Sequence, residues 1–129
     1  MRAELTSYNQ PPRKVRLVTE LVKGKRVSDA LAALSFLPKR ASDPIAKLIK
    51  SAAANATNKG EAADTLRIKN ITVDSAGMLV RMMPRAMGRG APIRRRKSRI
   101  IVTLDTLAPF KVSPKGAKKT SKKVAATAK

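Results

Sequence analysis

The chain has 129 residues and a formal net charge of +21, from 29 basic and 8 acidic residues, and it contains neither cysteine nor histidine. This inventory excludes a disulfide framework, a zinc site built from cysteine and histidine, and a histidine general base, so we expect no metal, no cofactor and no enzymatic activity. The charge predicts a polyanionic partner, and the scarcity of aromatic residues argues against a module that stacks bases on aromatic side chains.

The N-terminal segment predicts an edge strand and a cytoplasmic location. Within residues 2–9, Ala3 and Leu5 alternate with polar neighbours, as the side chains of a half-buried strand do. The first ten residues lack the apolar core of a signal peptide, and no apolar run reaches transmembrane length. We therefore expect a cytoplasmic protein that has no membrane partner.

The first helix is predicted to begin at the Pro11-Pro12 pair, with Asn9 as its N-cap. Valines at positions 15, 18 and 22 share one helical face, which indicates the buried side. The start of this helix carries three cations that oppose the helix macrodipole. These cations, Arg13, Lys14 and Arg16, either bind an external anion or form a solvated surface, and both alternatives stay open.

A basic turn and a second helix come next. Gly24 is predicted to end the first helix in the left-handed conformation, and three cations surround it to form a second basic cluster: Lys23, Lys25 and Arg26. Ser28 is expected to cap a helix over residues 29–37, which Pro38 terminates. The apolar spacing of this helix indicates a role in the core alone.

The third helix and the strand after it have the clearest periodicities in the chain. Asp43 is expected to cap a helix that reaches about Asn58, with an apolar stripe at Ile45, Leu48, Ile49, Ala52, Ala53 and Ala56. Apolar and polar residues then alternate from Leu66 to Lys69, and the alternation slips at Asn70. One extra residue at that point predicts a β-bulge.

Residues 71–104 predict a long β-hairpin. Two apolar, β-branched ends enclose a middle segment that is rich in arginine and free of acids, with Gly88 and Gly90 where the chain must reverse. A two-stranded ribbon is marginal in water, and its like charges repel one another. Arginine pairs with phosphate through a planar fork. The hairpin is therefore predicted to bind nucleic acid.

The end of the chain has a different composition. After Asp105 it consists largely of lysine and small residues and contains no further acid, which predicts a disordered basic tail over residues 106–129. The division that follows is one domain over residues 1–105, including the hairpin, and this tail.

Four motifs carry a resemblance to a known family. PPRKVRLV at 11–18, GKRVSDAL at 24–31, SAAANA at 51–56 and above all MMPRAMGRG at 82–90 resemble the twenty-second protein of the bacterial large ribosomal subunit. The resemblance covers about residues 3–105. It implies an α/β fold in which three helices pack on a small antiparallel sheet with one greatly extended β-hairpin.

The resemblance also implies a function. Such a protein is a structural constituent of the large subunit that binds its 23S rRNA and joins early in assembly. It is a monomer within the ribosome, among neighbouring ribosomal proteins, with its body near the polypeptide exit and its hairpin lining the tunnel near the nascent chain. The matching tip residues are Arg85, Ala86, Met87, Gly88, Arg89 and Gly90.

The residues expected to bind rRNA are the basic side chains of the first helix, the turn and the hairpin. They are Arg13, Lys14, Arg16, Lys23, Lys25, Arg26, Arg81, Arg85, Arg89, Arg94, Arg95, Arg96, Lys97 and Arg99. The alternative function is a histone-like protein that compacts nucleic acid, which the charge and the lysine-rich tail also fit. Binding to a membrane surface is disfavoured, because no amphipathic helix with aromatic anchors is present.

Overall fold

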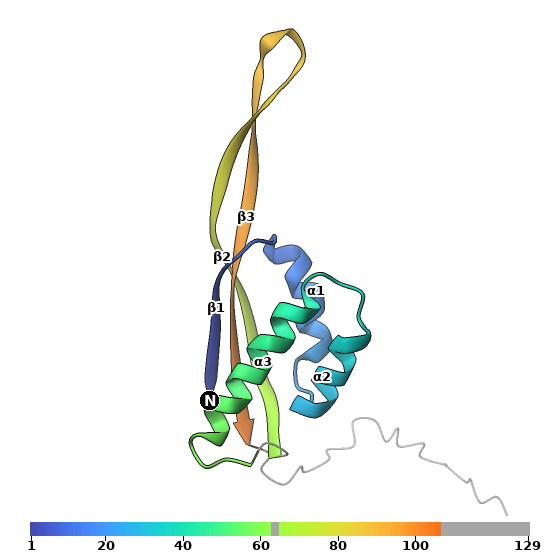
Figure 1. The fold of residues 1–129 in the computed structure, drawn as a ribbon, viewed down its shortest axis with the longest axis vertical. Helices are drawn as coiled ribbons and strands as arrows, with labels where there is room; N and C mark the ends of the chain where they lie inside the picture. The colour runs from blue at the N-terminus through green and yellow to red at the C-terminus, as the bar shows by residue number, and fades with distance from the viewer. Residues whose placement is uncertain (63–64, 107–129) are drawn as a thin grey trace, which may run out of the picture.

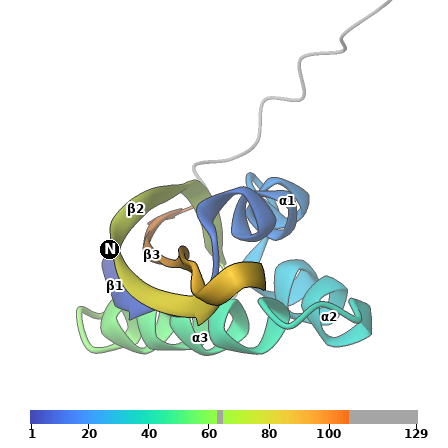
Figure 2. The same ribbon diagram turned by 90° about the horizontal axis from the view of Figure 1, so that it is seen from above.

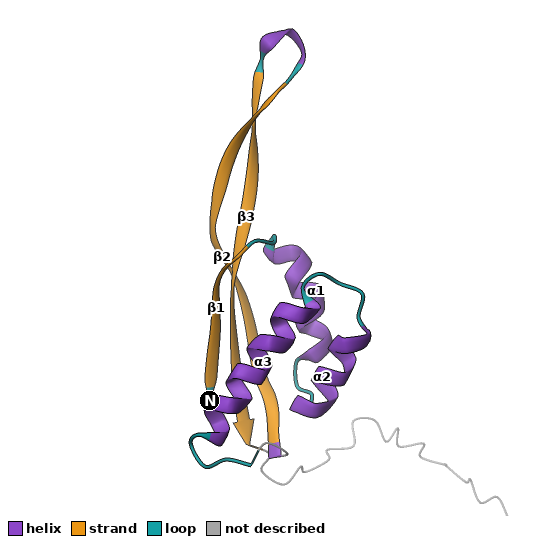
Figure 3. Ribbon diagram, viewed as in Figure 1, coloured by secondary structure: helices purple, strands orange, loops and turns teal. Residues whose placement is uncertain are grey.

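A computed structural model describes residues 1–62 and 65–106. In this part of the chain, three helices pack beside a three-stranded antiparallel sheet of order β1-β3-β2 (Figures 1 and 3). The elements are β1 (Arg2–Tyr8), α1 (Pro12–Val22), α2 (Val27–Phe36), α3 (Ser42–Thr57), β2 (Leu66–Pro84), the short 3-10 turn η2 (Ala86–Gly88) and β3 (Gly90–Thr106). The predicted α/β class and extended hairpin are confirmed. Thr106, which was predicted to begin the basic tail, is the last residue of β3, and the rest of that predicted tail, residues 107–129, lies outside the described residues.

The helices cover only the lower part of the sheet. In Figure 1 the arms of β2 and β3 continue well beyond the level at which α1 and α3 end, and Figure 2 shows the twisted sheet bordered by α3 on one side and α1 on another. The molecule therefore divides into a packed body, formed by the helices and the lower part of the sheet, and a projecting ribbon, formed by the free arms of β2 and β3.

In the described residues no helix is both long and apolar enough to cross a membrane.

The core lies where the predicted helical stripes meet the sheet. Val15 and Val22 of α1 and Ile45 and Ile49 of α3 are fully buried, and so is Ile100 of β3. Full burial of an aliphatic side chain of this size contributes about 1.5–3 kcal/mol. The alanine positions 52 and 56 of α3 are also fully buried, and their small side chains let the helix lie close to the sheet.

Two β-bulges interrupt the pairing of β2 with β3. The register shifts between Ile68 and Asn70, so that Lys69 is the extra residue, and the predicted bulge is confirmed. A second shift between Ser75 and Met78 was not predicted, and Gly77 adopts a positive φ of 93° there. Bulges increase the local right-handed twist. The second bulge follows Ser75, whose partner Ser98 also pairs with Tyr8 at the end of β1, so this bulge lies where the ribbon leaves the body.

The predicted helix caps are wrong. The N-cap positions are Pro11, Arg26 and Ala41, and none of them makes a capping side-chain hydrogen bond. The start of α2 is set by a tertiary contact. Ile68 N donates to Lys25 O at 2.9 Å, and this bond holds the residues before α2 extended against the edge of β2. Asn9, Ser28 and Asp43 are the residues that had been expected to cap.

Candidate nucleic-acid interface

The free part of the hairpin carries arginine on both of its faces. In an antiparallel pair, directly opposite residues share a face and successive residues alternate. Val80 lies opposite Arg94 and Met78 opposite Arg96, whereas Leu79 lies opposite Arg95. Two faces result. The Arg94 face contains Met78, Val80, Arg94 and Arg96, and the Arg95 face contains Leu79, Arg81, Ile93 and Arg95.

Apolar side chains accompany the cations on these faces. Met78, Leu79 and Val80 are each about half exposed, at 54%, 47% and 51%. Every residue of β2 from Gly77 to Pro84 is exposed. A ribbon that presents both apolar and cationic groups to each side has no core of its own, so it suits a partner that surrounds it and supplies negative charge.

The tip is a tight turn with two residues in the left-handed region. Met87 has φ 59° and ψ 33°, and Gly88 has φ 70°. Arg89 N donates to Ala86 O across them, and Arg85 N donates to Arg89 O at 2.7 Å. Positive φ at both central residues is the type I′ arrangement that matches the twist of a hairpin. This turn presents the Met87 side chain almost fully to solvent, at 93% exposure.

Arg16 has a partner inside the protein. Its guanidinium donates from Nη2 and Nε to Val73 O, at 2.8 and 3.2 Å. Val73 lies on β2, whose outer edge has no neighbouring strand in the sheet. An unpaired edge carbonyl needs a donor. Arg16 therefore ties α1 to the sheet, and this bond gives a structural role to one of the three cations at the helix start.

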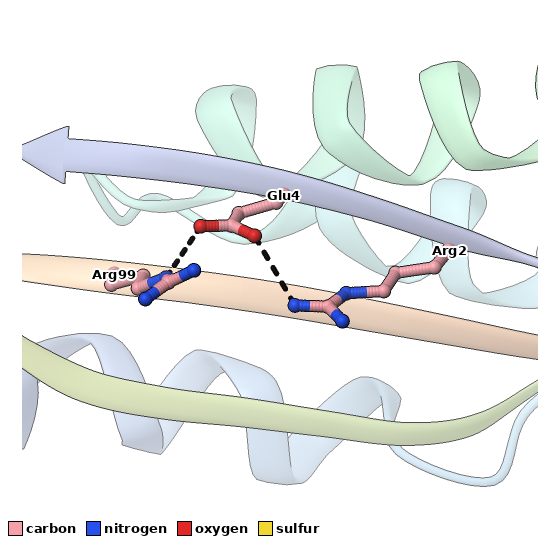
Figure 4. Close-up of polar contacts among 3 residues, drawn as sticks. All are labelled: Arg2, Glu4 and Arg99. Carbon is pink, nitrogen blue, oxygen red and sulfur yellow. Dashed lines mark hydrogen bonds and ion pairs between the residues drawn. The ribbon is translucent and has the colours of Figure 1, made fainter.

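Arg99 is also engaged within the protein. Glu4 accepts hydrogen bonds from Arg99 and Arg2, so that the carboxylate of β1 lies between two guanidinium groups (Figure 4). The Arg99 hydrogen bond is the main reason that the pKa of Glu4 is lowered from its ordinary value. The same bond raises the pKa of Arg99. This ion pair connects the edge strand to the base of the hairpin.

The basic turn after α1 lies against the outer edge of β2. Gly24 N donates to Ile68 O at 3.0 Å, and Arg26 pairs with Arg67 as an isolated bridge. Opposed residues of a bridge lie close together, so the backbone of Arg67 lies beside this turn. The structure thus adds Arg67 to the predicted cluster of Lys23, Lys25 and Arg26. Its position could not be inferred from local sequence.

The other predicted cations have no acidic partner in residues 1–62 and 65–106. The ion pairs of this part of the chain are Arg2–Glu4, Lys69–Asp105 and Arg99–Glu4. Arg13 and Lys14 are exposed on the first turn of α1, and Lys14 lines a groove at the hairpin root together with Arg40 and Lys97. Arg40 is a second residue that the sequence did not single out.

The sequence matches known proteins over most of its length. The family model for ribosomal protein L22p/L17e matches residues 3–105. A large ribosomal subunit protein uL22 of Pelobacter propionicus is 48% identical over 103 residues, which are 79% of this chain and 93% of the relative. The uL22 proteins of Desulfitobacterium hafniense and Herpetosiphon aurantiacus are 51% and 46% identical, over 72% and 81% of this chain and 82% and 93% of their own lengths.

A ribosomal-protein family is structural rather than enzymatic. The matches cover the helices, the sheet and the whole hairpin. The matched region therefore includes both the tip motif at residues 82–90 and the exposed cations of the hairpin. This chain is a member of the L22p/L17e family of ribosomal proteins.

Proposed function

We propose that this chain is a structural component of the large ribosomal subunit and that it binds the large-subunit rRNA chiefly through its hairpin. The observation that carries the proposal is the register of β2 and β3, which places Arg94 and Arg96 on one face and Arg81 and Arg95 on the other. The names of the relatives, which are large-subunit proteins, support the same assignment.

RNA phosphate satisfies the physical requirements of this ribbon. Each arginine that neutralises a phosphate releases a condensed counterion, and this release makes the binding dependent on salt. Cations on both faces favour insertion between RNA segments over adhesion to a single surface. The exposed Met78, Leu79 and Val80 gain when sugars and bases exclude water from them. Phosphate contacts then fix the position of the ribbon.

The finer role follows from the family resemblance. The tip, residues 85–90, lies at the far end of the ribbon from the body (Figure 1), which fits a segment that reaches the wall of the exit tunnel and meets the nascent chain. The body then lies near the polypeptide exit among neighbouring ribosomal proteins, as a monomer that joins early in assembly. These assignments are part of the proposal.

Paired substitutions on each face test the proposal. In the full chain, Arg94→Gln with Arg96→Gln, and separately Arg81→Gln with Arg95→Gln, should weaken binding to large-subunit rRNA. Each lost phosphate contact lowers the slope of log K against log salt by about 0.7–0.9, so each pair should lower it by about 1.4–1.8. Lys47→Gln with Lys50→Gln is the matched control, since both lysines are exposed on α3.

The result is judged from the two pairs of arginine substitutions and from a comparison of rRNA with duplex DNA. Losses from both faces, with wild-type binding stronger to rRNA than to duplex DNA at equal salt, support the proposal. Equal affinity for duplex DNA would favour the histone-like alternative. Hairpin slopes that match the Lys47 and Lys50 control would refute the role of the ribbon.

A further inference from the structure

The sheet is irregular at one level, the root of the ribbon. The pairing of β1 with β3 shifts register between Leu5 and Tyr8, where Ser7 has a positive φ of 57°. The second bulge of β2, which contains Gly77, lies on the other side of β3 at nearly the same level. A bulge bends its strand and increases the local twist. Two bulges at one level therefore concentrate the bending of the sheet where the ribbon begins.

Ser98 of β3 lies between these two bulges. It pairs with Tyr8 of β1 and with Ser75 of β2, so it keeps a partner on both sides. Its side chain is fully buried, whereas none of residues 90–97, which connect it to the tip, is buried. Ser98 is therefore the last buried residue of β3 before the ribbon leaves the body.

The hydroxyl of Ser98 holds the segment that passes the root of the ribbon. Ser98 Oγ donates a hydrogen bond to Gln10 O, in the connection between β1 and α1. Figure 1 shows this connection beside the ribbon at the level where the helices end. Gln10 N donates to Tyr8 O at 2.8 Å, and the Tyr8 hydroxyl donates to Arg40 O at 3.2 Å. One hydroxyl thus links the ribbon root to a segment that the body itself holds in place.

A serine at this position constrains the ribbon in a way that an aliphatic residue would not. Contacts between apolar side chains have little directional preference, whereas a hydrogen bond weakens steeply as its geometry departs from linear. A buried hydroxyl that loses its partner also carries a desolvation cost. Rotation of the ribbon about its root would break the bond from Ser98 to Gln10 O, so this bond opposes such a rotation.

We propose that Ser98 is a positioning residue, whose hydrogen bond to Gln10 O fixes the direction of the ribbon relative to the body. The two bulges supply the bend, and the Ser98 hydroxyl selects one orientation of it. The Arg94 face and the Arg95 face are then presented in a fixed orientation, which lowers the cost of ordering them on binding. The inference deepens the proposed function, but the direction of the ribbon is measurable without RNA.

Pulsed electron–electron double resonance on the full chain measures this direction. The chain contains no cysteine, so Lys50→Cys on α3 and Met82→Cys on β2, both at exposed positions, give one pair of spin labels between body and ribbon. Met82 lies opposite Pro92, and the strand from Pro92 to Ser98 is about 20 Å long. A rotation of about 10° at the root therefore moves the ribbon label by about 3–4 Å.

Ser98→Ala removes only the hydroxyl and should broaden or shift the distance distribution. Thr19→Val is the control, because Thr19 is also buried and its hydroxyl donates to Arg16 O at 3.0 Å within α1, away from the ribbon root. It should leave the distribution unchanged, and circular dichroism should show both variants folded. An unchanged distribution in Ser98→Ala, an equal broadening in Thr19→Val, or a broad distribution in the labelled chain that retains Ser98 would overturn the proposal.

Binding to large-subunit rRNA gives a second readout. Ser98→Ala removes no phosphate contact, so it should lower the affinity while leaving the slope of log K against log salt unchanged. The Arg94 and Arg96 pair should lower both. An affinity equal to the wild type, or a slope lowered as much as in the arginine pair, would contradict positioning as the role of Ser98 in binding. If the wild-type protein does not bind rRNA, the proposed function fails, while the spin-label distances still decide whether Ser98 directs the ribbon.

Discussion

Substitution of Arg16 separates two roles that the basic start of α1 combines. Arg16 donates two hydrogen bonds to Val73 O, whereas Arg13, one turn earlier, is exposed. Replacing Arg16 with methionine keeps the aliphatic stem and leaves the edge carbonyl of β2 without its donor. Arg13→Met removes the same charge without removing this bond. The pair of variants therefore compares a structural arginine with a candidate phosphate contact.

The loss of stability expected for Arg16→Met follows from the hydrogen bonds that Arg16 donates to Val73 O. Hydrogen bonds to charged groups contribute about 1.5–3 kcal/mol, and the solvent exposure of Arg16 lowers this to about 1 kcal/mol, because water can replace part of the interaction. For a domain of this size, 1 kcal/mol shifts the melting temperature by about 4–8 °C. Arg13→Met should change the free energy of unfolding by less than about 0.5 kcal/mol.

Binding to rRNA should rank the two variants the other way, with the larger effect for Arg13→Met. Urea unfolding reports the stability of both variants, and titration with large-subunit rRNA at several salt concentrations reports the number of phosphate contacts. Arg13→Met should lower the salt slope by about 0.7–0.9, and Arg16→Met should change it less. If Arg16→Met leaves stability unchanged and lowers the slope as much as Arg13→Met, the structural role assigned to Arg16 is wrong.

Three further predictions concern the edge strand, the second bulge and the tip. The pKa of Glu4 is lowered in the folded protein, so its contribution to stability is present above the ordinary carboxyl pKa and is lost as the pH falls through the lowered value. Urea unfolding at pH 7 and pH 3 should therefore show a smaller acid-induced loss in Glu4→Gln than in the wild type, and equal losses would contradict this. Gly77→Val should destabilise the ribbon by about 1–3 kcal/mol because φ is positive there, seen as faster amide exchange in β2, with Ala76→Val as control. Met87→Gly should relieve strain at a positive φ and slow exchange of the Arg89 amide, and faster exchange would count against the type I′ turn.

Local patterns were sufficient to predict much of the fold. The stripe through Ile45 and Ile49 marked the buried side of α3, and the slip at Asn70 located a bulge, because burial on one face imposes a periodicity that a single sequence displays. The second bulge falls in the polar and small residues Ser75 to Gly77, where β2 has no buried side chain and no alternation exists to be interrupted. The helix caps were missed because tertiary bonds, such as Ile68 N to Lys25 O, determine where α2 begins.

The candidate site was predictable only in part, for the same physical reason. A run of arginines identified the hairpin as a cationic segment, but its division into two faces depends on the pairing register. Arg40 and Arg67 lie in segments that carry no motif for binding. Only the fold brings Arg40 near Lys97 and Arg67 beside Arg26. Local sequence records the charge of a segment, whereas the gathering of charges from separate segments requires long-range structure.

The outer edge of β2 connects these observations. An unpaired sheet edge invites association with other chains, and here Arg16 and the Gly24–Arg26 turn occupy it through bonds to Val73 O and Ile68 O. Both elements belong to clusters that the sequence marked as nucleic-acid contacts. Protection of an edge requires backbone or guanidinium donors, while binding to phosphate requires charge, and a basic segment laid along the edge supplies both. If the chain binds rRNA as proposed, the basic segments that protect the outer edge of β2 also present their charge to RNA phosphate.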